Sequence, residues 1–252
     1  MLTRKLAALS IFWSISSLRQ PVARPRRVEH IMTMKLLCWN VNGIRSAATK
    51  GFLPWLAKAK PQVLCIQEAR ARPEQVDPEL VQPRGYQSWW ACAEKKGYSG
   101  VVIYSRVEPL EVIEGLGISR FDCEGRVLSA RFADFTIVNA YFPNGQRDHA
   151  RVPYKMEFCE VFLEFCEARR ARGENLVLCG DFNTAHGEID LARPRENQNT
   201  TGFLPLERAW MDQFVERGYL DIFRALNPAP GHYTWWSNRS GARERNIGWR
   251  ID

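Results

Sequence analysis

The chain has 252 residues, of which 45% are hydrophobic and 25% are charged, a composition that suits one large globular domain or two small ones. This composition excludes a disordered chain, a collagen-like repeat and a small protein held together by disulfides. The formal net charge is +7, but residues 1–33 hold six Lys or Arg and one Glu, so only +2 remains from Met34 onward. Net charge is therefore weak evidence for a nucleic-acid partner, and a case for DNA must come from local basic patches.

Residues 1–33 differ in composition from the rest of the chain. Their apolar stretch, Leu6 to Leu18, is too short and too rich in serine to cross a membrane. Their many arginines are typical of a mitochondrial presequence. The alternative is that the given start codon lies upstream of the true one, because Met32 and Met34 stand just before the first predicted strand; we favour this alternative. We expect a tail outside a domain of residues 34–252. The expected compartment is the bacterial cytoplasm, or the mitochondrion if the tail is a genuine presequence.

From Met34 onward, apolar runs of strand length alternate with amphipathic stretches, and no repeat or low-complexity linker divides the chain. The predicted strands are Lys35–Trp39, Val63–Gln67, Gly100–Ser105, Val127–Phe132, Phe135–Tyr141 and Asn175–Gly180. Helical spacing of apolar residues predicts helices over Pro153–Arg170 and about Leu206–Arg217. Strands 127–132 and 135–141 are close enough for a hairpin. The pattern predicts one α/β domain in which helices cover the sheets.

The seven cysteines are an odd number and contain no Cys-X-X-Cys pair. Several lie in apolar runs, such as Cys38 in LLCWN and Cys179 in LVLCGDF. They are typical of small buried hydrophobic residues in a reducing compartment. A zinc site is the alternative, but it needs clustered Cys and His, and the four histidines are scattered.

Polar residues follow three of the predicted strands at the point where each strand ends. Asn40 and Asn42 follow the first, Glu68 follows the second, and Asp181 and Asn183 follow the last. Each has a simple structural explanation, namely a turn, a solvated carboxylate or a helix cap. Their recurrence favours a site, because ligands of open α/β sheets bind at the carboxyl ends of strands.

This set of side chains suits a hard cation. Mg²⁺ is usually held by one or two protein carboxylates together with waters and a substrate phosphate, and Glu68 is the natural ligand. Asp181 can then position or deprotonate a water for attack on phosphorus. Asn183 and Asn40 can fix the geometry of water and phosphate through neutral hydrogen bonds. The residues therefore predict hydrolysis of a phosphodiester.

Several longer motifs carry a family resemblance, in the order WNVNGIR, IQEAR, AYFPNGQRDHARVPYK, LCGDFNTAHGEIDLARP, TGFLPLERAW and NIGWRID. From about Met34 to Asp252 the chain resembles the exonuclease III branch of the endonuclease/exonuclease/phosphatase superfamily, the apurinic/apyrimidinic endonucleases. The resemblance implies a four-layer α/β sandwich of two mixed sheets, face to face, with helices outside. It also implies a monomer, without a membrane partner, that cuts double-stranded DNA 5′ to an abasic site with Mg²⁺ or Mn²⁺ and acts on 3′ ends as an exonuclease and end-cleaning enzyme.

The resemblance implies roles for residues around the metal. Glu68 matches the metal-binding Glu. Asn40 and Asn42 match a polar pair whose second member is Asp in some relatives, so that Asn42 makes a weaker ligand. Arg70 stands where many relatives have Lys, which keeps the charge but changes its geometry.

The resemblance also implies catalytic roles at two later strand ends. Tyr141 matches the Tyr that approaches the scissile phosphate, and Asn144 matches the Asn beside it. Asp181 matches the residue that activates the attacking water, and Asn183 matches its hydrogen-bonding neighbour. Without the family match, Tyr141 is equally well explained as an amphipathic residue at the end of a strand.

Substrate recognition is expected in the later segments. Trp235, Trp249 and Ile251 match the apolar walls that hold a flipped-out abasic sugar, whereas Trp236 is expected in the core. The basic residues expected at phosphates are Arg147, Arg151, Arg239, Arg243, Arg245 and Arg250. The alternative explanations are bulk apolar core for the tryptophans and a solvated charged face for the arginines.

The C-terminal end departs from the family pattern. Relatives continue past the position of Asp252 to a Ser-Asp-His segment whose His contacts the scissile phosphate and pairs with the Asp that matches Asp252. His149 and His186 fit structural hydrogen bonding instead. We expect a truncated chain that lacks the last strands, with low solubility and little activity.

Two other functions remain open at this point. One is a phosphodiesterase or phosphatase of the same superfamily that acts on a non-DNA phosphate ester. The other is an inactive fragment that binds abasic DNA but lacks the catalytic His. The region of Trp235 and the GWRID motif favours the DNA-repair branch.

Overall fold

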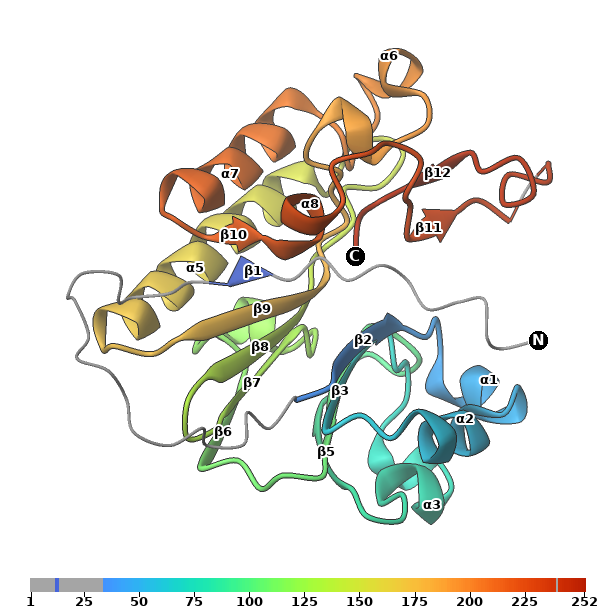
Figure 1. Ribbon diagram of the computed structural model, residues 1–252, viewed down its shortest axis with the longest axis vertical. Helices are drawn as coiled ribbons and strands as arrows, with labels where there is room; N and C mark the ends of the chain where they lie inside the picture. Colours follow the sequence, from blue (N-terminus) through green and yellow to red (C-terminus); the bar gives the residue numbers. More distant parts are fainter. Residues whose placement is uncertain (1–11, 14–33, 239) are drawn as a thin grey trace, which may run out of the picture.

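Two β-sheets pack face to face in the computed structural model, which describes residues 12–13, 34–238 and 240–252. Helices cover the outer face of each sheet (Figure 1). Both sheets contain parallel and antiparallel neighbours, so both are mixed. The predicted four-layer α/β sandwich is confirmed.

The smaller sheet has four strands and lies against three helices. Its strands, in spatial order, are β2 (Leu36–Asn40), β3 (Val63–Gln67), β5 (Val101–Ser105) and β4 (Gln87–Ala91). The covering helices are α1 (Ile44–Thr49), α2 (Phe52–Ala59) and α3 (Pro78–Val81). Strand β3 is buried on both faces, because Val63 and Cys65 face the other sheet while Leu64 and Ile66 face the helices. This is why its sequence is an unbroken apolar run.

The larger sheet has six strands and carries the two longest helices. Its strands, in spatial order, are β10 (Leu220–Asp221), β1 (Phe12–Trp13), β9 (Leu176–Asp181), β8 (Thr136–Tyr141), β7 (Val127–Arg131) and β6 (Glu111–Glu114). Helix α5 (Val152–Ala171) buries Phe158 and Phe162 against the outer face, beside Trp210 of α7 (Pro205–Glu216). The two predicted helices and the predicted hairpin of β7 and β8 are confirmed.

The core between the sheets contains Cys38, Cys65 and Cys179. Cys159 and Cys166 lie on the buried face of α5, and all seven cysteines are free thiols. The prediction that most cysteines are small buried hydrophobic residues is therefore confirmed.

Short elements complete the described part of the chain. They are α4 (Ser119–Asp122), α6 (Pro194–Asn197), α8 (Ile222–Leu226), β11 (Trp235–Trp236), β12 (Gly248–Trp249) and two 3₁₀ turns at Pro73–Gln75 and Glu188–Asp190. Strands β11 and β12 form an antiparallel pair that stands apart from both sheets (Figure 1). Strand β1 comes from the segment that we expected outside the domain, and it pairs with β9 and β10. The rest of residues 1–33 lies outside the described residues.

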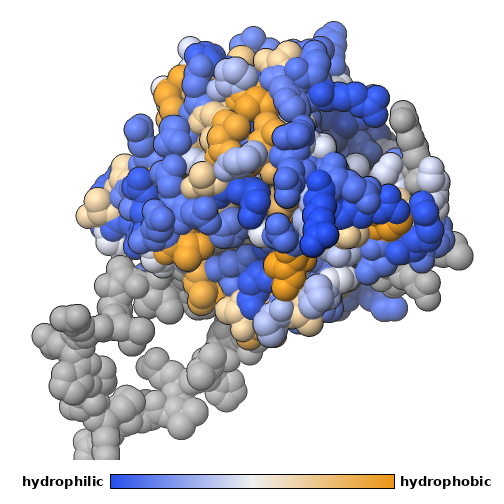
Figure 2. Space-filling view, turned by 90° about the horizontal axis from the view of Figure 1, so that it is seen from above, coloured by the Kyte–Doolittle hydropathy of each residue, from blue (hydrophilic) through white to orange (hydrophobic). Residues whose placement is uncertain are grey.

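The surface is mostly hydrophilic on the face that Figure 2 shows, with apolar residues in separated patches. In the described part of the chain, none of the helices is long and apolar enough to cross a membrane.

Candidate active site

The carboxyl ends of β2, β3, β8 and β9 meet at one edge of the two sheets. Strands β8 and β9 are parallel, with Tyr141 directly opposite Asp181, and β2 and β3 are parallel, with Asn40 opposite Gln67. A cavity of about 960 Å³ opens at this edge. Thirteen of the predicted site residues line it: Asn40, Asn42, Glu68, Arg70, Tyr141, Asn144, Asp181, Asn183, Trp235, Arg243, Trp249, Ile251 and Asp252.

Glu68 lies at the centre of the polar contacts on one side of the cavity. Its Oε1 accepts hydrogen bonds from the Tyr141 hydroxyl at 2.5 Å and from Asn40 Nδ2 at 3.3 Å. Its Oε2 forms an ion pair with the guanidinium of Arg70. The side chain of Glu68 is only 12% exposed, so this carboxylate is held in a fixed place.

Asp181 lies on the other side and is held through both carboxylate oxygens. Asn40 Nδ2 donates to its Oδ2 at 2.7 Å, and the backbone N–H of Asn183 donates to its Oδ1 at 2.8 Å. Asn40 thus bridges Glu68 and Asp181 with one amide group. The neighbouring Asn144 donates to Asn183 Oδ1 at 3.2 Å, which joins the β8 end to the β9 end.

The site contains more negative charge than its surroundings neutralise. Burial and the nearby charge of Asp252 raise the pKa of Asp181 well above its usual range. Burial also raises the pKa of Asp252 to about 6, and the charge of Glu68 adds to this shift. Burial and the charge of Glu68 raise the pKa of the Tyr141 hydroxyl. Perturbed acids that converge in a cavity are typical of a functional site, and a bound cation would relieve their repulsion.

The donor set fits a cation that keeps several water ligands. In the described residues, no group of three or more His, Cys, Asp or Glu side chains is arranged to hold a metal ion. A zinc site with all its ligands from protein would need such a group. Mg²⁺ needs only one or two carboxylates, which Glu68 and its neighbours supply, with the side-chain oxygen of Asn42 as a further neutral donor.

Four cavity residues have left-handed backbone conformations, which are uncommon for residues other than glycine. The φ angles are 49° at Asn42, 54° at Glu68, 52° at Arg70 and 49° at Asn183. Asn tolerates this region, whereas Glu and Arg rarely adopt it. Such strain persists where the surrounding structure fixes the chain, and it concentrates at functional sites.

Gly180 allows Tyr141 and Asp181 to lie side by side. A Cβ at this position would lie 1.8 Å from the backbone oxygen of Ala140 in the neighbouring strand, and φ is +147°. Only glycine permits this close approach of β8 and β9 at their carboxyl ends.

The opposite wall of the cavity is apolar. Trp249 and Ile251 pack on a small buried cluster that includes Leu191 and Phe203, and Trp235 is 47% exposed at the mouth. The prediction that Trp236 lies in the core is wrong, because its half-buried ring lines the cavity on the short β11–β12 pair. The Arg243 guanidinium lies 5.0 Å from the centre of that ring.

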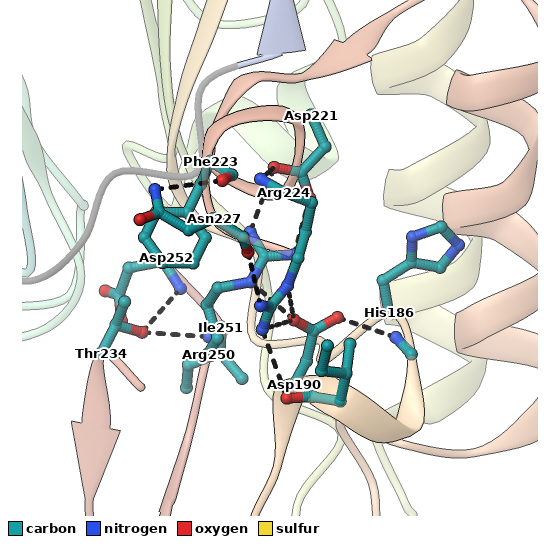
Figure 3. A network of polar contacts seen from close by, with 12 residues as sticks. His186, Asp190, Asp221, Phe223, Arg224, Asn227, Thr234, Arg250, Ile251 and Asp252 are labelled. Atoms are coloured by element: carbon teal, nitrogen blue, oxygen red, sulfur yellow. Dashed lines mark hydrogen bonds and ion pairs between the residues drawn. The ribbon is translucent and has the colours of Figure 1, made fainter. Parts of the chain in front are cut away.

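Arg250 does not face the cavity, contrary to the prediction that it binds substrate. Its side chain is 3% exposed and pairs with Asp190 at 2.7 Å and Asp221 at 2.6 Å (Figure 3). Asp190 also pairs with Arg224 at 2.6 Å. Adjacent residues of an extended segment point to opposite sides, which is why Ile251 faces the cavity while Arg250 is buried.

The other predicted arginines lie at different places around the cavity. Arg151 pairs with Glu124 and donates to Tyr98, and Arg245 donates to the backbone of Ser240. Arg147 is exposed on the loop after Asn144, outside the cavity lining, so its role stays a prediction. Arg239 lies outside the described residues.

His186 has a structural contact, as expected. Its Nε2 lies 2.7 Å from Asp212 Oδ1 of α7, away from the cavity lining. His149 also lies outside that lining, at the turn before α5. Neither histidine lies beside Asp181.

Two residues of the site were missed in the sequence. Arg126 donates to the backbone oxygen of Tyr141 at 2.8 Å and lies 4.9 Å from the centre of its ring. The Thr234 hydroxyl accepts the backbone N–H groups of Ile251 and Asp252 at 3.0 and 3.1 Å. Arg126 could have been identified, because it is a charged residue directly before the apolar strand β7. Nothing in the local sequence marks Thr234.

The fold and the site agree with the comparison to known proteins. The sequence pattern of the endonuclease/exonuclease/phosphatase family matches residues 37–252, so the chain belongs to this family. It is an enzyme of the exonuclease III type, as the motifs predicted.

Relatives of known name resemble the chain over most of its length. An exodeoxyribonuclease of Bacillus subtilis is 43% identical over 87% of this chain and 86% of its own. The DNA repair nuclease APEX1 of Danio rerio is 40% identical over 87% of this chain and 71% of its own. The solved structure of an AP endonuclease from Archaeoglobus fulgidus superposes with a TM-score of 0.79 and 32% identity, over 87% of this chain and 85% of that one.

Proposed function

We propose that this chain is a Mg²⁺-dependent DNA repair nuclease that hydrolyses the phosphodiester 5′ to an abasic site. The same centre would act on 3′ ends as a 3′-5′ exonuclease and end-cleaning enzyme. The observation that carries the proposal is the joining of Glu68, Asn40 and Asp181 by hydrogen bonds beside an apolar wall. The names of the relatives support it, and a 3′ phosphatase from Neisseria, 29% identical, was solved with a product DNA hairpin.

Glu68 would hold the cation, with Asn42 as a neutral neighbour and with water and phosphate oxygens as the remaining ligands. When bound, Mg²⁺ would neutralise charge that develops on the phosphate oxygens. Asp181 would orient and deprotonate the attacking water, because Asn40 and the N–H of Asn183 fix both of its oxygens. Tyr141, whose burial keeps its hydroxyl protonated, would turn this hydroxyl from Glu68 to the bound phosphate and donate its hydrogen bond there.

The apolar wall would select the abasic sugar. Trp235, Trp249 and Ile251 offer ring and aliphatic surface, which suits a flipped-out sugar that lacks a base. Arg70 at the cavity and Arg147 outside it would neutralise phosphates of the same strand. A non-DNA phosphate ester would not need this extended wall.

The test uses the full chain and a duplex with one synthetic abasic site. Under this proposal, wild-type protein nicks the labelled strand 5′ to the site with Mg²⁺, at a rate that can be low but lies above the protein-free control, and stops when EDTA is added. Binding to abasic duplex without nicking would identify an inactive DNA-binding protein. Hydrolysis of a small phosphate ester with no action on the duplex would identify a different phosphodiesterase.

Glu68→Gln tests the metal-binding role. Because a neutral amide loses most of the attraction for a divalent cation, half-maximal nicking should need about tenfold more Mg²⁺. The Mg²⁺ titration of the nicking rate measures this shift. A titration unchanged from wild type would remove Glu68 from the metal site.

A further inference from the structure

A buried ion pair lies behind the cavity, between α5 and α7. Lys155 Nζ lies 2.6 Å from Glu207 Oε1, and both side chains are fully buried. Neither residue lines the cavity. A buried ion pair is weak evidence for stability, because apolar residues of similar volume often stabilise a core as well or better. The other contacts of these two side chains therefore decide what the pair does.

Lys155 holds the turn that carries Asn183. Its Nζ donates to the backbone oxygen of Asn183 at 2.8 Å. The N–H of Asn183 in turn donates to Asp181 Oδ1 at 2.8 Å, and Asn183 has a left-handed φ of 49°. The ammonium group of Lys155 thus holds the carbonyl of Asn183, while the N–H of the same residue orients the carboxylate of Asp181. We assign this carboxylate to the attacking water.

Glu207 holds the neighbouring segment of the cavity wall. Its Oε1 accepts the Thr201 hydroxyl at 2.9 Å, and its Oε2 accepts the N–H groups of Gly202 at 2.5 Å and Leu204 at 3.0 Å. Thr201 and Gly202 line the cavity. A Cβ at Gly202 would lie 3.0 Å from the Asn183 oxygen and 3.5 Å from the ring of Trp249. The two segments therefore touch each other at the point that the ion pair supports.

We propose that Lys155 and Glu207 are positioning residues for the reaction. Lys155 keeps the Asn183 turn in the conformation that orients Asp181, and Glu207 keeps Thr201 and Gly202 in the wall that receives the substrate. The inference rests on the proposed function, because its activity readout is cleavage of abasic duplex. Its second readout, the environment of the Asn183 amide, does not depend on any substrate.

The experiment compares three variants of the full chain with wild type, each below its unfolding temperature. Lys155→Met removes the donor to Asn183 but leaves Glu207 with a buried charge. Lys155→Met/Glu207→Gln removes both charges and keeps one acceptor oxygen on residue 207. Arg169→Met is the matched control, because Arg169 lies on the same helix, is buried and pairs with Glu174 at 2.9 Å away from the cavity.

Lys155→Met is expected to lower kcat about tenfold or more, with KM for the duplex changed less than threefold, since a displaced Asp181 affects turnover first. The double variant is expected to regain thermal stability while kcat stays low and KM rises. In both, the Asn183 amide resonance should shift in a ¹⁵N–¹H spectrum, whereas Arg169→Met should lower the unfolding temperature and leave kcat, KM and this resonance unchanged.

Recovery of kcat together with stability in the double variant would show that the pair is only structural and would overturn the inference. Loss of kcat in Arg169→Met equal to that in Lys155→Met would overturn it as well. If wild type fails to cleave abasic duplex, the proposed function is wrong, and the Asn183 resonance alone then decides the positioning role. A variant that unfolds is replaced by the double variant, which carries no buried unpaired charge.

Discussion

Two groups of largely buried carboxylates lie on either side of the segment Arg250 to Asp252 and differ in how their charge is neutralised. In the first group, Asp190 and Asp221 accept hydrogen bonds from Arg224 and Arg250 (Figure 3). Burial alone would raise the pKa of Asp190, but the contacts from these guanidinium groups outweigh it and lower the pKa. The charges of this group are neutralised by one another, and its ion pairs join the segments around residues 190, 221 and 250.

The second group is Glu68, Asp181 and Asp252, which face the cavity, and in it Glu68 pairs with Arg70. Here burial and mutual repulsion raise the pKa of Asp181 and Asp252, and the partners of Asp181 are amides rather than arginines. Arg250 and Asp252 are two positions apart, yet they belong to different groups. Arginine contacts thus distinguish the carboxylate of Asp190, which we interpret as structural, from the carboxylate of Asp181, which faces the cavity with amide partners.

The largest expected effect comes from Asp181→Asn. If Asp181 is the base for the attacking water, turnover on abasic duplex should fall by about 10³, within the range of a positioned acid or base. Affinity for the duplex should stay nearly the same, as measured by titration without Mg²⁺. Glu188→Gln, which removes one exposed charge nearby, is the control and should leave turnover unchanged. Equal losses of binding and turnover would mean that Asp181 only caps the strand end.

Asp190→Asn should have the largest effect on stability. It leaves the partly exposed Arg224 and the buried Arg250 without the carboxylate that both contact, and breaking one side of a buried pair costs about 3 kcal/mol. Because the folded pKa of Asp190 is lowered, this contribution is present above its unfolded pKa of about 4 and is lost as the pH falls below it. Urea unfolding at pH 8 and at pH 3 measures the difference. Equal stability of variant and wild type at pH 8 would contradict the structural role.

Asp252→Asn should change stability in the opposite direction and by less. The folded pKa of Asp252 is about 6, above an unfolded value near 4, so the folded state loses stability as the pH rises between these values. The Asn variant does not titrate there. Without metal at pH 8 it should therefore be more stable than wild type by up to about 2.7 kcal/mol, and this advantage should vanish below pH 4.

A lower stability of Asp252→Asn at pH 8 would show that the carboxylate is compensated in the fold. In that case the distinction between the two groups would not hold. Urea unfolding with EDTA present keeps metal binding out of this measurement.

Much of the fold follows from apolar patterns in the sequence. The six predicted strands and both predicted helices form, because long apolar runs and helical spacing leave few alternatives. Strand β6, with the sequence EVIE, was missed because it lies at a sheet edge and carries a charge at each end. Strand β4 was missed because its two tryptophans are only partly buried and show no alternation with polar residues.

The candidate site was predicted only where local sequence carries the information. Polar residues at strand ends mark Asn40, Glu68 and Asp181, and the parallel register then brings them together. The burial and ion pairs of Arg250 could not be predicted from its neighbours in the sequence, because its partner Asp190 lies 60 positions earlier in the chain. Its neighbours in the sequence indicate only a basic run, whereas the fold supplies the carboxylates that neutralise it.

The hydrogen bond from Asn40 to Asp181 joins residues 141 positions apart, and the one from Tyr141 to Glu68 spans 73. Contacts of such sequence separation form late, because a long loop must close before they are made, and they slow folding. During synthesis Asn40 and Glu68 are made before β9 and before the segment around Trp249. The site therefore cannot assemble until these later segments are present. The proposed site is incomplete in a partly synthesised chain, and a local opening between the two sheets would separate Asn40 and Glu68 from Asp181 and Tyr141.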